Sequence, residues 1–193
     1  MDKLDYLRDF YRSQGVPTIL QDGYETLLEK AKEKQPKNIL EIGTATGMSA
    51  IALAGVTEAK ITTVEIREKS YLTAKENFES FSLSERITPF LGDSLDVIPT
   101  LREKYDFVFL DGAKSKYLKN LLLIEPLLEK DALVVADNVL FRGYIEGKVP
   151  FVHRQKTIVV NMREYLKYVF QGEKYDSELV RKGDGISCSV YKG

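Results

Sequence analysis

The stretch Asn38-Ile-Leu-Glu-Ile-Gly-Thr-Ala-Thr-Gly-Met-Ser49 decides the fold of this chain. Its first half contains an apolar run, residues 39–42, that is typical of a buried parallel strand. The run breaks at Gly43 and Gly47 and passes into residues 49–54, whose alanines favour a helix. A strand that turns through glycines into a helix N-terminus lets the backbone approach a ligand closely. In α/β sheets such a loop lies at the carboxyl ends of the strands, where nucleotides bind.

The length and composition predict one globular domain over residues 1–193. The chain is long enough to bury one core, and its content of 44% hydrophobic and 30% charged residues is that of a soluble protein. Lys and Arg number 28 against 29 Asp and Glu, which excludes a global polybasic character. Residues 139–193 nevertheless carry 10 Lys/Arg and 6 Asp/Glu. This local excess permits an anionic partner near the C-terminal third without requiring one.

The low cysteine content and the lack of a long apolar run indicate a cytoplasmic protein with no membrane partner. The single cysteine, Cys188, excludes an internal disulfide and fits a reducing compartment. It lies in an alternating segment, residues 186–191, which favours a small buried thiol over a nucleophile. The N-terminus lacks an apolar signal core, and no apolar run approaches the ~20 residues of a membrane span.

Strand and helix patterns alternate five times, which predicts a doubly wound parallel sheet. The expected strands are 38–42, 61–65, 87–91, 106–111 and 132–137, and the expected helices are 2–14, 22–34, 47–54, 67–81, 94–103, 115–129 and 154–170. Pro89 indicates an irregular or edge position for its strand. Two last strands, 175–181 and 185–191, flank a Gly-Asp-Gly turn typical of a tight hairpin, so the sheet should end antiparallel.

Two acidic residues at strand ends are candidates for holding a nucleoside. The glycine loop is neither a Walker loop nor a complete dinucleotide fingerprint. Glu65, however, closes the next strand 22 residues after Gly43, where a carboxylate can accept hydrogen bonds from ribose hydroxyls. It could also merely cap the helix that starts near Arg67. Asp93 ends the third strand, where it could meet an adenine amino group, cap the following helix, or do both.

Three oxygen-bearing side chains end the fourth and fifth strands. Asp111, Asp137 and Asn138 should converge on one rim, and two carboxylates with an amide oxygen suit Mg²⁺. Ordinary turn formers at strand ends are the alternative. Lys114 lies three residues past Asp111, where a metal and partial burial could let it lose its proton and act as a base. A solvated loop lysine is the competing interpretation.

Together these motifs resemble the metal-dependent, S-adenosylmethionine-dependent O-methyltransferases of the catechol and caffeoyl-CoA group. The motifs are Glu41–Ser49, Glu65, Gly92-Asp-Ser94, Asp111-Gly-Ala-Lys114-x-x-Tyr117 and Asp137-Asn-Val-Leu-Phe-Arg-Gly143. The resemblance covers essentially the whole chain and implies a class I methyltransferase fold, Rossmann-like and mostly parallel with an antiparallel C-terminal hairpin strand. Residues 137–143 and 153–165 are most similar to bacterial tRNA 5-hydroxyuridine methyltransferases. Two departures are Ala45 in place of a glycine and a short N-terminal segment.

The resemblance assigns roles to individual positions. It implies that S-adenosylmethionine is bound by Thr18, Gly43, Met48, Ser49, Glu65, Asp93, Ser94 and Asp111, with Met48 and Ser49 at the floor of the loop. It implies that Asp111, Asp137 and Asn138 hold Mg²⁺ or another divalent cation, and that Lys114 and Asp111 are catalytic. We also expect the helices of residues 1–35 to cap the site, and the resemblance makes a homodimer plausible.

The methyl acceptor is not fixed by the metal site, because a catechol and 5-hydroxyuridine both present two adjacent oxygens to a cation. Our leading expectation is the 5-hydroxyl of the wobble uridine in a tRNA anticodon, with a small catechol-type acceptor as the alternative. Phosphates of tRNA could be held by Arg142, Arg154, Lys156 and Arg163, with Phe141 and Tyr144 stacking on a base. A merely solvated helix face is the competing interpretation, and His153 should belong to this surface instead of the metal site.

A catalytically silent nucleotide-binding module is a further alternative. The joint presence of Asp111, Lys114, Asp137 and Asn138 argues against it.

Overall fold

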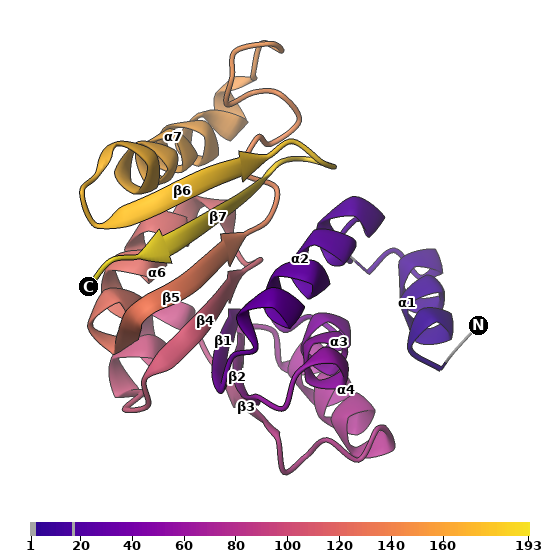
Figure 1. Cartoon of the computed structure of the whole chain (residues 1–193). Coiled ribbons are helices and arrows are strands. Elements are labelled where there is room, and N and C mark those ends of the chain that lie inside the picture. The colour runs from indigo at the N-terminus through magenta and orange to yellow at the C-terminus, as the bar shows by residue number, and fades with distance from the viewer. Residues whose placement is uncertain (1–2, 17) are drawn as a thin grey trace.

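The computed structural model describes residues 3–16 and 18–193. Within these ranges the core is a seven-stranded sheet with the strand order β3-β2-β1-β4-β5-β7-β6 (Figure 1). The strands are β1 (Asn38–Ile42), β2 (Lys60–Glu65), β3 (Ile87–Leu91), β4 (Tyr105–Leu110), β5 (Leu128–Ala136), β6 (Tyr175–Val180) and β7 (Ile186–Tyr191). The first five run parallel, whereas β7 is antiparallel to both of its neighbours. The predicted doubly wound sheet with an antiparallel end is confirmed.

Helices cover both faces of the sheet. They are α1 (Lys3–Ser13), α2 (Gln21–Lys34), α3 (Met48–Val56), α4 (Glu68–Ser80), α5 (Ser94–Val97), α6 (Tyr117–Ile124) and α7 (Lys156–Gln171), with 3₁₀ turns η1 (Ile98–Thr100), η2 (Lys114–Lys116), η3 (Glu125–Leu127) and η4 (His153–Gln155). Strand β4 shows how the alternation divides the core. Phe107 and Phe109 pack in the cluster that contains α2 and α3, whereas Val108 and Leu110 pack in the cluster that contains α6 and α7. Because both faces are buried, residues 107–110 of β4 are all apolar.

Proline explains where element boundaries differ from those expected. The helix expected over 115–129 ends at Ile124, because Pro126 lacks an N–H and turns the chain into η3. Pro99 likewise converts the second half of the segment 94–103 into η1. Pro89 lies in β3, the outer strand next to β2, so its missing donor faces no partner strand and the edge prediction holds.

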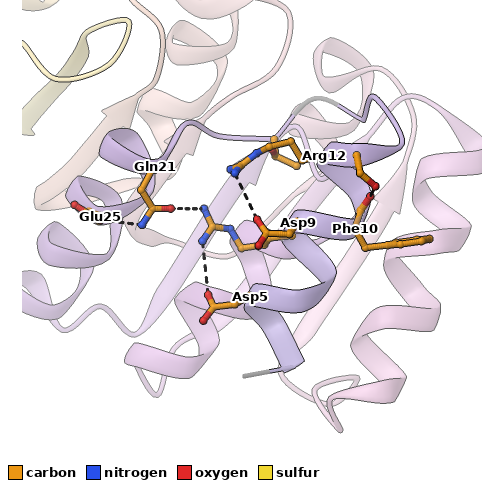
Figure 2. Close-up of polar contacts among 9 residues, drawn as sticks. Asp5, Asp9, Phe10, Arg12, Gln21 and Glu25 are labelled. Carbon is orange, nitrogen blue, oxygen red and sulfur yellow. Dashed lines mark hydrogen bonds and ion pairs between the residues drawn. The ribbon is translucent and has the colours of Figure 1, made fainter. Parts of the chain in front are cut away.

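Two arginines of α1 make polar contacts with α2 and with Thr18, and Figure 2 shows the surroundings of Arg12 and Gln21. Arg8 is only 4% exposed, and its guanidinium lies 3.3 Å from the centre of the Tyr24 ring while Nη2 donates to Gln21 Oε1 at 3.4 Å. Arg12 Nε donates to the hydroxyl of Thr18, also at 3.4 Å. These contacts tie α1 to α2 and to Thr18, which lies beside the carboxyl ends of the strands.

Candidate active site

A cleft of about 620 Å³ lies where the parallel strands end. Its walls are the loops that follow β1 to β5, together with the segment that leads into α2. The volume is that of a small-molecule site. Ten of the residues predicted for the site line it: Thr18, Gly43, Glu65, Asp93, Ser94, Asp111, Lys114, Asp137, Asn138 and Arg142.

Gly43 allows the loop after β1 to pass very close to the loop after β4. Its φ is +107°, and a Cβ there would lie 2.6 Å from the carbonyl oxygen of Asp111. No side chain fits at that distance, so only glycine can occupy the position. The Gly43 amide also donates to Val64 O at 3.0 Å, which ties the loop to the end of β2.

Glu65 lies at the end of β2, where its carboxyl group lines the cleft and accepts two backbone hydrogen bonds. Its Oε1 accepts a hydrogen bond from the Arg67 amide at 2.8 Å, just before α4 begins at Glu68, so the carboxyl group fixes the approach to the helix without capping its first turn. Its Oε2 accepts from the Ala45 amide, also at 2.8 Å, and the side chain lines the cleft. A carboxylate has about four acceptor sites, so capacity for ribose hydroxyls remains. Ala45 adopts φ +47°, a left-handed conformation that glycine tolerates better.

Met48 and Ser49 differ from the expectation, because their side chains do not line the cleft. Met48 is 6% exposed and belongs to the core between α3 and the sheet. The Ser49 hydroxyl donates to Glu41 Oε1 at 2.5 Å, and Thr63 donates to the other oxygen of that buried carboxyl. Burial raises the pKa of Glu41 to about 7. The first turn of α3 therefore supports the loop from beneath.

The acidic rim, formed by Asp111, Asp137 and Asn138, lies in an environment that opposes negative charge. Burial raises the pKa of Asp111 to about 8, and the neighbouring charge of Asp137 adds to the effect. Asp137 is 3% exposed, and burial raises its pKa to about 6. Asn138, at φ +57°, donates from Nδ2 to Asp137 Oδ2 at 2.7 Å. Two acids that are costly to ionise alone become stable carboxylates beside a cation.

The start of α2 covers this rim. A Cβ on Gly23 would lie 3.1 Å from Asp137 Oδ1, so the helix backbone passes directly over that carboxyl group. One side chain of the same turn, Asp22, accepts a hydrogen bond from the Gly183 amide in the β6–β7 hairpin at 3.2 Å. These contacts support the expected capping by residues 1–35 on the α2 side, although capping of a bound molecule stays a prediction.

The rim offers hard oxygen donors that fit a divalent cation. Among the residues of 3–16 and 18–193, no three His, Cys, Asp or Glu side chains gather as a metal site. The candidate ligand set is therefore the two carboxylates and the Asn138 amide oxygen, which leaves coordination positions for water or an acceptor. His153 is exposed in η4 and does not line the cleft, as expected.

Lys114 and Asp184 bring opposite charges to the cleft wall beside the rim. Lys114 begins η2, and its positive charge lowers the pKa of Asp111 and of Asp137 against the effect of burial. Asp184, which the sequence indicated only as part of a turn, lines the cleft and raises the pKa of Asp137. Its Oδ1 accepts from the Arg142 amide at 2.5 Å and so holds the loop that follows β5.

The four cations expected to hold tRNA have different environments. Arg142 is exposed and lines the cleft, whereas Arg154 and Lys156 are exposed but outside it. Arg163 does not line the cleft and binds the chain itself, because Nε donates to Ile145 O at 3.0 Å and Nη2 to Tyr144 O at 3.2 Å. Of the four, only Arg142 reaches the candidate site.

Cys188 is a buried thiol, as expected. It is 3% exposed in β7, and burial raises its pKa to about 11, so the nucleophilic thiolate is disfavoured. In the part of the chain that the structure describes, no helix combines the length and apolar character needed to cross a membrane.

The sheet order, the glycine loop and the cleft are those of the S-adenosylmethionine-dependent methyltransferases. The family comparison narrows this class to the methyltransferases that methylate oxygen. A model of the O-methyltransferase family matches residues 24–191, and the chain belongs to this family. It is 32% identical over 191 residues to catechol O-methyltransferase of Sus scrofa, covering 94% of this chain and 91% of that protein. The chain also matches catechol O-methyltransferase of Bos taurus, but the match covers a smaller share of that protein's length, 59%.

Solved structures agree with this assignment. A candidate caffeoyl-CoA O-methyltransferase from Staphylococcus aureus is 26% identical and superimposes with a TM-score of 0.91, covering 99% of this chain and 93% of that one. An O-methyltransferase from Bacillus cereus, solved in complex with S-adenosylhomocysteine, has a TM-score of 0.87 at 22% identity, covering 100% and 92%. Because its sequence identity is low, the similarity to the Bacillus cereus protein shows a shared fold alone.

Proposed function

We propose that this protein transfers the methyl group of S-adenosylmethionine, with the help of a divalent cation, to a hydroxyl of a small acceptor that carries two adjacent oxygens, as a catechol does. The observation that carries the proposal is the acidic rim. Asp111 and Asp137 lie side by side in the cleft, where burial raises the pKa of both. A cation beside them removes the cost of their charges, and an acceptor with two oxygens can complete its coordination.

The cofactor would lie along the half of the cleft formed by the loops after β1 to β3. Gly43 lines this half of the cleft and lets the Asp111 loop pack directly against the glycine loop, and Glu65 has acceptor capacity for the ribose hydroxyls. This arrangement directs the methionine portion toward Asp111, whose loop touches Gly43. The transferable methyl group would then face the acidic rim.

Asp111, Asp137 and Asn138 would hold the cation. A bound divalent cation lowers the pKa of a coordinated hydroxyl and fixes its orientation. Lys114 lies at the same wall and would take up the hydroxyl proton at Nζ, because the two carboxylates are engaged by the cation. Transfer is an in-line displacement, so alignment of the oxygen with the methyl group supplies much of the remaining rate enhancement.

A tRNA wobble 5-hydroxyuridine is a second candidate acceptor, and one observation favours it. Arg142 is exposed at the cleft, and its guanidinium makes no ion pair with any described residue within 4 Å. It could therefore contact a phosphate next to the reacting base. The engagement of Arg163 in the loop and the catechol O-methyltransferase relatives support the small acceptor more strongly.

The deciding experiment measures methyl transfer from labelled S-adenosylmethionine with and without Mg²⁺. The acceptors are two matched pairs, catechol against phenol and tRNA that contains 5-hydroxyuridine against the same tRNA with uridine. We expect Mg²⁺-dependent labelling of catechol and little of phenol, which lacks the second oxygen. Labelling of only the hydroxyuridine tRNA would reject the small-acceptor proposal in favour of the second candidate.

The Asp137→Ala variant tests the rim itself. We expect this variant to bind S-adenosylhomocysteine and to lose transfer, because one cation ligand is gone. Transfer at the wild-type rate would contradict the metal role.

A further inference from the structure

Two polar links join the segment that follows β3 to η2 and α6, which follow β4. Lys116 Nζ forms an ion pair with Asp93 Oδ2 at 2.5 Å, and Ser94 Oγ donates to Asn120 Oδ1 at 2.9 Å. The side chains of Lys116 and Asp93 are each 29% exposed, and both residues line the cleft. The ion pair is therefore part of the wall.

Both carboxylate oxygens of Asp93 already accept a hydrogen bond from the chain. Its Oδ1 accepts from the Leu95 amide at 3.0 Å as the N-cap of α5, and its Oδ2 accepts from Lys116. The hydrogen bond from Lys116 is also the main reason that the pKa of Asp93 lies below its ordinary value. An adenine amino group that approached Oδ2 would share this oxygen with an ammonium ion, and the charged donor forms the stronger bond.

The inference rests on the proposed function, in which the adenosine of the cofactor would lie at the ends of β2 and β3. Glu65 would hold the ribose at the end of β2, and β3 is the next strand outward from the acidic rim. The ion pair spans the two loops that would flank the adenine ring. It can hold them at a fixed separation before the cofactor arrives, and such preorganisation raises affinity by lowering the ordering cost of binding.

From this arrangement we infer that Lys116 is a positioning residue that strengthens cofactor binding by clamping Asp93, so that Asp93 fixes the adenine slot without reading the adenine amino group. The competing arrangement makes the opposite prediction. If Asp93 were the acceptor of the adenine amino group, Lys116 would obstruct it, and removal of the lysine would tighten binding.

The test measures the dissociation constant of S-adenosylhomocysteine by calorimetry for the wild type, Lys116→Gln, Asp93→Asn and the double variant. A partly exposed ion pair contributes modestly, so we expect Lys116→Gln to weaken binding about threefold to tenfold. Asp93→Asn should weaken it by a similar factor, and the double variant should be little weaker than either single one. Lys116→Arg should restore most of the affinity, because a cation again reaches Asp93.

Two controls separate the clamp from general damage. Lys119→Gln removes an exposed cation from the neighbouring helix α6, outside the cleft, and should leave the dissociation constant as in the wild type. Raising the salt concentration should reduce the difference between the wild type and Lys116→Gln, because ions screen the pair. Binding that is unchanged or tighter in Lys116→Gln would overturn the inference, as would fully additive losses in the double variant. Because no methyl acceptor is present, these results are independent of the proposed substrate.

Discussion

Replacement of Asp111 by asparagine should stabilise the metal-free protein while removing its response to the cation. In the folded protein the pKa of Asp111 is raised from 3.8 to about 8, chiefly by burial. One pKa unit corresponds to about 1.4 kcal/mol, so at pH 7 this carboxyl group costs the folded state about 4 kcal/mol relative to the unfolded chain. Asparagine has nearly the same shape and no charge to bury. Allowing for the amide's own need for a partner, we expect a gain of about 2 to 4 kcal/mol in the free energy of unfolding.

The pH dependence follows from the direction of the shift. A carboxyl group with a raised pKa keeps its proton in the folded state at pH values where the unfolded chain has lost it. Wild-type stability should therefore fall as the pH rises from about 4 to about 8, and the advantage of Asp111→Asn should grow over the same interval. Urea unfolding in EDTA at several pH values between 4 and 8 measures both quantities.

Addition of Mg²⁺ should reverse the order of stability of the wild type and Asp111→Asn. The wild type should gain stability by binding the cation, whereas Asp111→Asn should gain much less because one of its two carboxylate ligands is absent. Asp176→Asn, at an exposed position of β6, is the matched control and should change stability little at any pH. If Asp111→Asn is no more stable than the wild type at pH 8 in EDTA, the assignment of a buried, charge-opposing environment is wrong.

Three other substitutions test the loop and the base. Gly43→Ala should destabilise the fold by about 3 kcal/mol or more, seen as a lower urea midpoint, because its Cβ would lie 2.6 Å from Asp111 O at φ +107°. Ala45→Gly should instead raise stability by up to about 1 kcal/mol, since φ +47° disfavours a side chain; a loss would show that chain entropy dominates. Lys114→Met should lower the rate of transfer about 100-fold or more at saturating cofactor; a wild-type rate would exclude Lys114 as the base.

The fold was predictable because hydrophobic pattern and turn residues agree along the chain. Each strand expected from an apolar run is present, and the Gly-Asp-Gly turn does join two antiparallel strands. The boundaries near Pro99 and Pro126 were less accurate, because periodicity carries no information on where a helix gives way to a 3₁₀ turn. Likewise β5 begins at Leu128, since pairing with Tyr105 of β4 extends it beyond the apolar stretch that indicated a strand.

The candidate site was predictable where topology alone brings residues together. Strand-end residues such as Asp111 and Asp137 meet because parallel strands share one edge. Side-chain direction within α3 was not predictable, and Ser49 bonds to Glu41 beneath the loop. The Lys116–Asp93 pair joins residues 23 positions apart through a 3₁₀ turn whose geometry no sequence pattern indicated.

The place of β7 inside the sheet has a consequence for folding during synthesis. Residues 133–136 of β5 pair with residues 187–190 of β7, and β6, which is made earlier, pairs only with β7. Until Ile186–Tyr191 leaves the ribosome, the parallel strands that carry the glycine loop can assemble, but β5 presents an open, apolar edge to other chains. Strand β6 has no place to dock in that interval. The hairpin therefore adds the last two strands together, and a pause in translation just before β7 would be the moment of greatest exposure to aggregation.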